Sequence, residues 1–220
     1  MIRFNVITIF PELIDAYFSQ GVIARAKGEG TIIRINAHNL RDWTEDAHKT
    51  VDDSPFGGGP GMILKFEPIY KAVSNLRKFK VQSSKFKVVL TSARGKKFTQ
   101  KKAQEYSKLD QLIIICGRYE GVDERVAGYI ADESISIGDF VLSGGELGAM
   151  VIIEAVARLI PGVLGNEASP SQALFPQYTR PEVFKSEDGK EWKVPKILLS
   201  GNHRVITEWR KKHSTSLNRN

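Results

Sequence analysis

Cysteine is almost absent from this sequence, and so are long apolar runs. The one cysteine in 220 residues, Cys116, cannot form an intramolecular disulfide or a thiolate metal site by itself, as is typical of a reducing compartment. No window reaches the roughly 18 consecutive apolar residues of a membrane span. The apolar N-terminal run ends at Pro11 and lacks a signal-peptide cleavage site. We therefore expect a cytoplasmic protein.

The common cofactor and metal motifs are also missing. The first expected strand runs into Phe10, Pro11 and Glu12, where a dinucleotide-binding fold would have G-x-G-x-x-G. The stretch GGGPGM at 57–62 lacks the Gly-Lys-Ser/Thr of a phosphate-binding P-loop. The four histidines have no short metal-ligand spacing. NAD binding, ATP hydrolysis and a histidine-rich metal centre are therefore disfavoured.

Positive charge is in excess and unevenly placed. The composition is that of a folded globular protein, 41% hydrophobic and 26% charged, with a net charge of +7. Residues 71–102 hold eleven basic and no acidic side chains, and residues 183–220 hold nine basic and four acidic ones, which leaves −9 for the rest. Two basic segments on an acidic body favour a nucleic acid partner. A solvated basic face is the alternative that charge alone leaves open.

The hydrophobic pattern alternates between strand and helix. We expect strands at 4–10, 31–36, 86–91, 111–116 and 133–137, and helices at 12–26, 68–79, 99–109 and 146–159. Such alternation predicts an α/β fold with a mostly parallel sheet and helices on both faces. The ligand of such a sheet lies beyond the carboxyl ends of its strands.

Glycine-bearing loops follow three of the expected strands, at 92–95, 117–121 and 138–145. Glycine allows close backbone approach, so these loops can surround a small ligand with main-chain N–H and C=O groups. Three separate tight turns are the alternative. Because parallel strands end at one edge of the sheet, the loops are expected to converge there.

Four long phrases carry a family resemblance: TVDDSPFGGGPGM at 50–62, CGRYEGVDER at 116–125, SIGDFVLSGGEL at 136–147 and LLSGNH at 198–203. IPGVLG at 160–165 and YTRP at 178–181 add to it. In this order they resemble the bacterial tRNA (guanine-N1)-methyltransferases, which methylate guanine 37 beside the anticodon. The resemblance runs from residue 1 to about residue 215.

The resemblance implies an α/β SPOUT fold, whose parallel sheet carries a deep trefoil knot. It also implies a small helical C-terminal domain, which is shortened in this sequence. It implies a knotted cofactor-binding domain at 1–165, an interdomain linker at 166–182 and a basic tRNA-binding domain at 183–220. It also implies a homodimer with active sites shared between subunits, and S-adenosylmethionine as cofactor. The implied cofactor contacts are Leu90, Ser92, Gly95, Gly117, Tyr119, Gly121, Ile137, Gly138, Asp139, Phe140, Val141, Leu142, Gly144 and Gly145.

Methylation of guanine N1 requires removal of its proton and stabilisation of the charge that grows on O6. The resemblance implies that Arg158 supports this chemistry, and an i,i+4 pair with Glu154 is the alternative for that arginine. It places Asp52 near the target guanine, where an Asx turn is the alternative. Gly61 matches a close backbone approach to the substrate. Carried over in the same way, Arg118 positions RNA and Glu120 holds a divalent ion such as Mg²⁺.

The linker departs from the family pattern. The aspartate expected there as general base is replaced by Ala173, and the segment is about seven residues shorter than usual. Three alternatives follow: the base is Glu167, Asp52 or water; a segment is missing from the sequence; or the protein binds tRNA and cofactor without turnover. A related knotted enzyme that methylates ribose or another base is a more remote alternative. Glu167, the one acid in the shortened segment, is the replacement candidate.

The C-terminal segment is about forty residues long from Val183, which is short for an independent core. We therefore expect it to dock on the other subunit. Four of its basic residues are expected to meet tRNA phosphates: Arg210, Lys211, Lys212 and Arg219.

Overall fold

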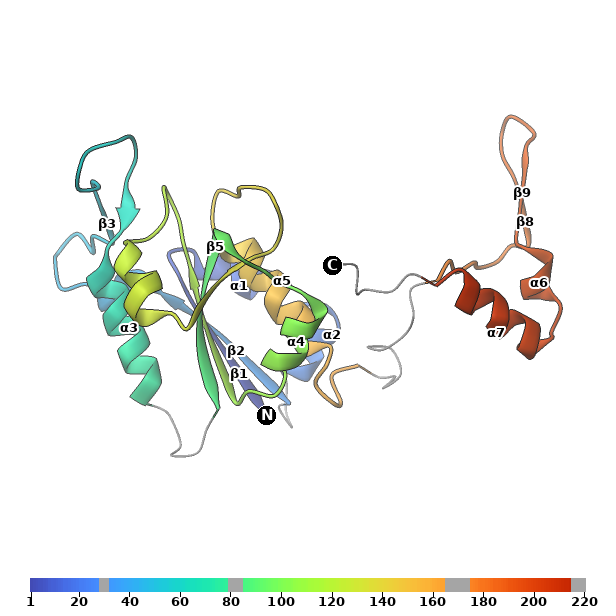
Figure 1. The fold of residues 1–220 in the computed structure, drawn as a ribbon, viewed down its shortest axis with the longest axis horizontal. Helices are drawn as coiled ribbons and strands as arrows, with labels where there is room; N and C mark the ends of the chain where they lie inside the picture. The colour runs from blue at the N-terminus through green and yellow to red at the C-terminus, as the bar shows by residue number, and fades with distance from the viewer. Residues whose placement is uncertain (28–31, 79–84, 165–174, 215–220) are drawn as a thin grey trace. The chain divides into compact units, whose positions relative to one another are not determined.

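The computed structural model describes residues 1–27, 32–78, 85–164 and 175–214 (Figure 1). The chain forms two compact units, Met1–Glu167 and Ala168–Asn220, which are described separately below. Three residues singled out in the sequence, Glu167, Ala173 and Arg219, lie outside the described ranges.

The first unit contains a five-stranded sheet in which every neighbouring pair is parallel. The strand order is β2-β1-β6-β5-β7. The strands are β1 (Ile2–Thr8), β2 (Ile33–Asn39), β5 (Phe86–Lys97), β6 (Gln111–Cys116) and β7 (Glu133–Ser136). The predicted α/β architecture with a parallel sheet is therefore confirmed.

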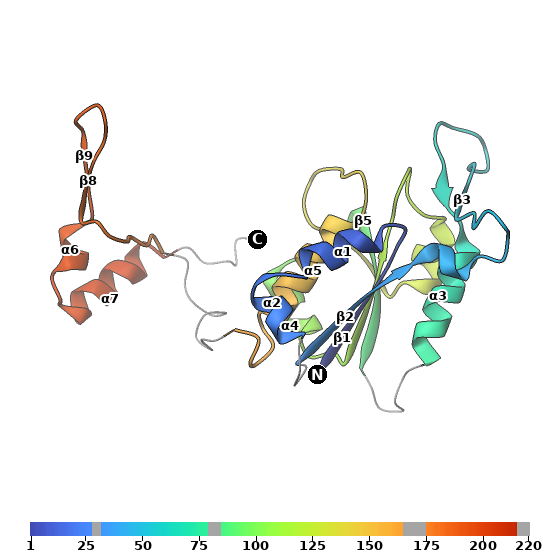
Figure 2. The ribbon, with the colours of Figure 1, turned by 180° about the vertical axis from the view of Figure 1, so that it is seen from behind.

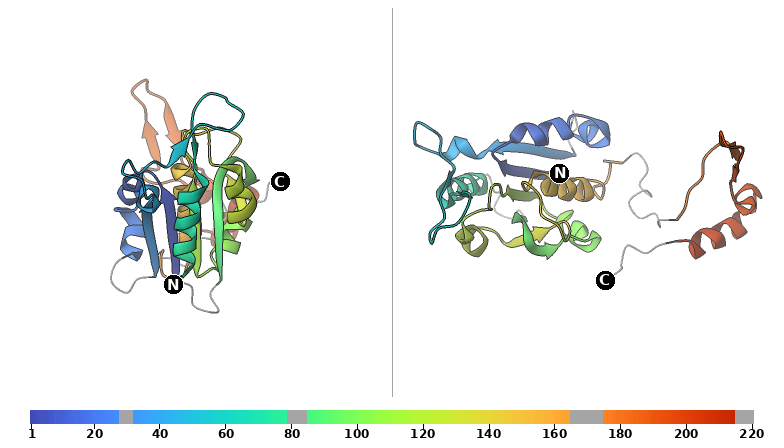
Figure 3. Two further views of the ribbon diagram at one scale, coloured as in Figure 1. Left: turned by 90° about the vertical axis from the view of Figure 1, so that its left-hand side faces the viewer. Right: turned by 90° about the horizontal axis from the view of Figure 1, so that it is seen from above.

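In the first unit, helices cover both faces of the sheet (Figure 1). All six residues of β6 are buried, so both faces of this strand have to be covered. Leu112 and Ile114 point into one core, and Ile113 and Ile115 into the other. The first core is covered by α1 (Pro11–Tyr17), α2 (Gly21–Ala26), α4 (Gln100–Tyr106) and α5 (Glu146–Ala157), and the second by α3 (Phe66–Lys78), η1 (Leu40–Trp43) and η2 (Val126–Ile130). Figures 2 and 3 show the same two layers from behind and from above.

Among the predicted elements of the first unit, two differ most from the structure. The helix expected at 12–26 is divided into α1 and α2, because Gln20 is extended and Gly21 has a φ of +78°. The Ser19 hydroxyl donates to the carbonyl of Ala16 at 2.7 Å at the end of α1. Strand β5 does not end at Thr91 but continues to Lys97, with a register shift against β7 between Thr91 and Lys96. Residues 92–95, expected as a loop, therefore form an irregular extension of the strand.

The second unit carries a hairpin and two helices. The hairpin strands are β8 (Val183–Lys185) and β9 (Glu191–Lys193), and the helices are α6 (Lys196–Leu199) and α7 (His203–Lys212). The Asn202 side chain caps α7 by accepting from the N–H of Val205 at 3.3 Å. The hairpin was not predicted from the sequence. None of the described residues of this unit is fully buried.

No helix within the described ranges is long and apolar enough to cross a membrane.

Candidate functional site

A pocket of about 490 Å³ lies at the carboxyl ends of β6 and β7 and beside residues 90–94 within β5. Its lining comes from residues 90–94 of β5, from β7, from the glycine-bearing loops that follow β6 and β7, and from Ala127 of η2 and Gly148 of α5. A cavity of this volume suits a small organic ligand. The loops at 117–121 and 138–145 converge as predicted, whereas residues 92–94 contribute from within strand β5.

Most of the implied cofactor contacts line this pocket: Leu90, Ser92, Gly117, Tyr119, Gly121, Ile137, Phe140, Val141, Leu142, Gly144 and Gly145. Three do not. Gly95 packs against the backbone of Ile135. The carbonyl of Gly138 accepts from the Ser136 hydroxyl at 2.8 Å, and Asp139 pairs with Lys97 at 2.5 Å.

The second and third loops touch through their backbones at Gly145. Its N–H donates to the carbonyl of Gly117 at 2.8 Å. A Cβ on Gly145 would overlap the hydroxyl of Thr91 and lie 2.9 Å from Cα of Cys116 and 3.0 Å from N of Gly117. Only glycine allows the two loops to approach this closely.

The pocket wall combines apolar side chains with exposed main chain. Leu90 and Ile137 contribute apolar surface, and Phe140, Val141 and Leu142 are exposed large hydrophobic residues of the third loop. The glycine loops add exposed main chain, and Ser92, Arg94 and Glu120 are among the polar side chains that line the pocket. An apolar wall with a few polar groups is typical of a small-molecule site.

Arg118 of the second loop is held by a buried acid. Its Nε donates to Oε2 of Glu146 at 3.0 Å, and its guanidinium lies over the ring of Phe10 at 4.7 Å. The other oxygen of Glu146 accepts from the Thr8 hydroxyl at 2.6 Å. The end of β1, the second loop and the start of α5 therefore meet at one carboxylate.

Sequence reasoning missed Glu146 and Thr8. The motif SGGEL contains Glu146, but only Glu154 and Arg158 of the expected helix at 146–159 were considered for a role. The available signal was the placement of an acid as the first residue of an otherwise apolar helix, a position that favours carboxylates.

A hairpin, β3 (Asp52–Asp53) paired with β4 (Ile63–Leu64), lies against the second loop. The Leu64 N–H donates to the Gly121 carbonyl at 3.0 Å, and the Glu120 N–H donates to the Met62 carbonyl at 3.0 Å. Gly61 has φ of +82°, and a Cβ on it would lie 2.5 Å from Cγ of Glu120. The structure therefore brings Gly61 and Glu120 together.

Asp52 belongs to the same hairpin and is half-buried. Within the described ranges no side chain forms a hydrogen bond or ion pair with its carboxylate. Glu120 is exposed at the pocket. No group of three or more His, Cys, Asp or Glu side chains in the described part of the chain could hold a metal ion.

Arg158 lies away from the pocket, at the C-terminal end of α5. It is exposed, and no described residue forms an ion pair with it, so the alternative pairing with Glu154 is not formed. It continues an exposed stripe of α5 that includes Leu147 and Val151. Leu13 and Tyr17 are likewise exposed on α1, the helix packed beside α5.

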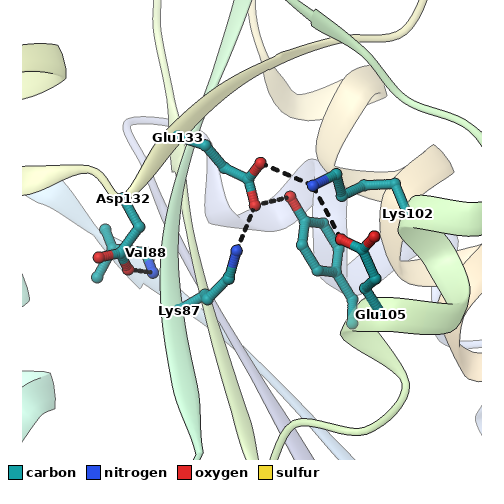
Figure 4. Close-up of polar contacts among 7 residues, drawn as sticks. Lys87, Val88, Lys102, Glu105, Asp132 and Glu133 are labelled. Atoms are coloured by element: carbon teal, nitrogen blue, oxygen red, sulfur yellow. Dashed lines mark hydrogen bonds and ion pairs between the residues drawn. The ribbon is translucent and has the colours of Figure 1, made fainter.

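A polar network supports the start of β7, which contributes Ser134 to the pocket wall. The Glu133 carboxylate accepts from Lys87 and from the Tyr106 hydroxyl, both at 2.9 Å, and from Lys102 at 3.0 Å (Figure 4). These bonds join β7 to β5 and to α4. The hydrogen bonds of Glu133 therefore hold β7 in place next to Ser134, the pocket-lining residue.

In the second unit, the basic residues predicted to meet phosphate lie in the last turn of α7. They are Arg210, Lys211 and Lys212. The Arg210 guanidinium lies over the ring of Phe175 at 5.1 Å. A cavity of about 750 Å³ lies beside these two residues, with Tyr178 and Arg180 in its wall.

Fold and pocket together define an α/β protein with a small-molecule site at the carboxyl ends of its parallel strands. Residues 2–220 match the model of one family, described as tRNA (Guanine-1)-methyltransferase TrmD. The chain belongs to this family.

Several curated relatives are similar over most of their length, and all three described here are named tRNA (guanine-N(1)-)-methyltransferase. That of Dictyoglomus turgidum is 50% identical over 221 residues, 97% of this chain and 85% of the relative. Those of Carboxydothermus hydrogenoformans and Geobacillus kaustophilus are 48% and 46% identical over 219 residues, 96% of this chain and 82% and 86% of the relatives.

Proposed function

We propose that this protein transfers a methyl group from S-adenosylmethionine to N1 of guanine 37 in tRNA. Family membership supports the reaction and the substrate class. Within the chain, the observation that carries the proposal is the meeting of three glycine-bearing segments around one pocket of about 490 Å³. The basic segments supply the charge that an RNA substrate requires.

S-adenosylmethionine supplies an activated methyl group on a sulfonium. The apolar wall residues fit its adenine ring, and the backbone of the second and third loops fits its polar groups, while Gly145 keeps the loops close together. The protein has to bind, orient and exclude water, because aligning donor and acceptor provides most of the acceleration of such a displacement. The pocket-lining contacts named above are the residues that we assign to this role.

The acceptor nitrogen of guanine carries a proton that a base must remove. Asp52, on the hairpin beside the second loop, and Glu167 are the carboxylates that we propose for this step. Arg158 is proposed to stabilise the negative charge that develops on O6. Gly61 and Arg118 are proposed to contact the RNA near the target.

Arg158 reaches the reacting guanine in this scheme only from a second copy of the chain, since it lies outside the pocket of its own subunit. We therefore propose a homodimer with shared active sites. The exposed apolar side chains of α1 and α5, among them Leu13, Tyr17, Leu147 and Val151, support an interface there.

We propose further that the crossing of the second and third loops closes the deep trefoil knot of the SPOUT fold. The backbone hydrogen bond from Gly145 to Gly117 supports a tight crossing. The second unit is proposed to grip tRNA through Arg210, Lys211 and Lys212. Glu120 is proposed as one ligand of Mg²⁺, which proteins commonly bind with one or two carboxylates and substrate phosphates. Such an enzyme works where tRNA and its methyl donor are present, in the cytoplasm.

Purified full-length protein, S-adenosylmethionine and an unmodified tRNA with guanine at position 37 test the proposal. We expect N1-methylguanosine in the digested RNA by mass spectrometry, and none with a matched tRNA carrying adenine at position 37. Binding of both ligands without product would favour the non-catalytic alternative. Methylation of a ribose or another base would favour the related knotted enzymes.

A further inference from the structure

Glu146 is the one acidic side chain that is almost fully buried within the described ranges, with 1% of its surface exposed. Burying a carboxylate is costly unless it is paired and hydrogen-bonded. Glu146 begins α5, a helix of 12 residues, and the partial positive charge of the helix start offsets part of that cost. Its contacts with Arg118 and Thr8 provide the rest of the compensation.

These contacts hold Arg118 from two sides. The carboxylate of Glu146 takes the Nε edge of the guanidinium, and the ring of Phe10 covers its face. Thr8 links the two, because its hydroxyl donates to Glu146 at 2.6 Å and accepts from the N–H of Phe10 at 3.0 Å. The same small network therefore positions both the carboxylate and the ring.

The outer nitrogens of Arg118 are left largely uncommitted. Nη1 makes one long contact, 3.4 Å, with the carbonyl of Ser143. Nη2 has no partner among the residues that the structure describes. Arg118 also lines the pocket. A planar guanidinium fixed at Nε and on one face presents its remaining donors in a set direction, which suits phosphate or carbonyl oxygens.

We propose that Glu146 is a positioning residue for substrate RNA. It fixes the guanidinium of Arg118, with Thr8 and Phe10, so that the free donors of Arg118 engage oxygen atoms of the tRNA. The proposal rests on the proposed function, since it takes tRNA as the ligand that Arg118 meets. It adds a residue that does not touch the RNA itself.

Two conservative variants separate this role from a general structural one. Glu146→Gln removes the charge but keeps the shape of the side chain. Its amide can still form hydrogen bonds with Arg118 and with the Thr8 hydroxyl. Arg118→Lys keeps the charge but removes the planar fork. Each single variant is expected to lower kcat/KM for tRNA by about 10- to 100-fold, the effect of losing one charge-assisted hydrogen bond. Calorimetry measures the affinity for S-adenosylmethionine as well, and the loss toward tRNA is expected to be the larger of the two.

The double variant decides the matter. If Glu146 acts through Arg118, the double variant should be about as impaired toward tRNA as either single variant. Additive losses in kcat/KM for tRNA would overturn the proposal. A matched control is Glu133→Gln, which removes an ion-paired carboxylate elsewhere on the sheet (Figure 4). Its effect should add to that of Arg118→Lys, because the two groups do not touch.

Failure of the proposed function gives a different result. If the wild type does not methylate tRNA, the same cycle is measured on tRNA affinity and on the free energy of unfolding in urea. Coupling between Glu146 and Arg118 in these measurements supports the positioning contact without any turnover. Its absence from both overturns the inference.

Discussion

Glu133 keeps its charge in a half-enclosed site because several donors reach its carboxylate. Burial on its own raises the pKa of this group, but hydrogen bonds from Lys87, Lys102 and Tyr106 outweigh it and lower the pKa to about 2. The same carboxylate and burial together raise the pKa of the Tyr106 hydroxyl. Ionised Glu133 therefore stabilises the folded protein.

This shift predicts a pH dependence of stability. A carboxyl whose pKa falls from an ordinary 4.5 to about 2 on folding contributes its full stabilisation above the unfolded value. That stabilisation is lost as the pH falls from about 4.5 to about 2. Thermal unfolding of wild type and Glu133→Gln should therefore differ most above about pH 5 and converge toward about pH 2. A melting difference that is constant across this range would contradict the assignment.

Residue identities allowed some roles to be predicted and concealed others. Glycines near strand ends indicated the pocket, because few other residues let two backbone segments come so close. Gly145 is an example, since a Cβ there would collide with neighbouring atoms. The sequence could not show that Gly95 serves the contact between β5 and β7 instead of the pocket, since this follows from the register shift of β5. Glu146 was hidden for a similar reason, because its partners lie 138 and 28 residues away in the chain.

At the scale of elements, prediction succeeded where one pattern determined the outcome. The run at 111–116 is apolar enough for a strand buried on both faces, and β6 has the predicted bounds. The end of β5 could not be predicted, because Lys96 and Lys97 are held in the sheet by pairing with β7 and not by their own strand preference. The hairpin β8–β9 was missed because its strands are only three residues long and fully exposed.

The hairpin β3–β4 provides a prediction about how two elements meet. Gly61→Ala places a methyl group on a residue with φ of +82° and against the Glu120 side chain. The backbone strain should cost about 1–2 kcal/mol, and Glu120 has to move. We expect a lower kcat for tRNA methylation with little change in S-adenosylmethionine affinity. Steady-state kinetics and calorimetry measure the two effects.

Gly57→Ala is the matched control for that variant. Gly57 has a similar φ, +85°, but a Cβ there would meet nothing within 4 Å. Gly57→Ala therefore introduces the same kind of backbone strain as Gly61→Ala, but no collision with Glu120. Equal kinetic effects of the two variants would show that strain in the hairpin, and not displacement of Glu120, causes the loss.

At the scale of the whole molecule, the positions of Arg158 and the pocket are the main constraint. The pocket lies at the carboxyl ends of the strands, whereas Arg158 ends an exposed stripe of α5 that carries Leu147 and Val151. Exposed apolar patches mark surfaces that bind other molecules, and a two-fold dimer buries the same patch of both copies. A shared active site would place the arginine of one copy at the pocket of the other.

Subunit complementation tests this arrangement. Arg158→Ala removes the arginine, and Leu142→Asp places a carboxylate in the apolar wall of the pocket at an exposed position, so that folding is spared. Each homodimer is expected to be inactive in tRNA methylation. Mixed dimers, co-expressed with two different tags and purified through both, contain one site with an intact pocket and an intact arginine. They should recover about half of the wild-type rate if the site is shared across a two-fold interface. Size-exclusion chromatography with light scattering measures whether all three species are dimers, and mixed dimers that stay inactive would place Arg158 in the site of its own subunit.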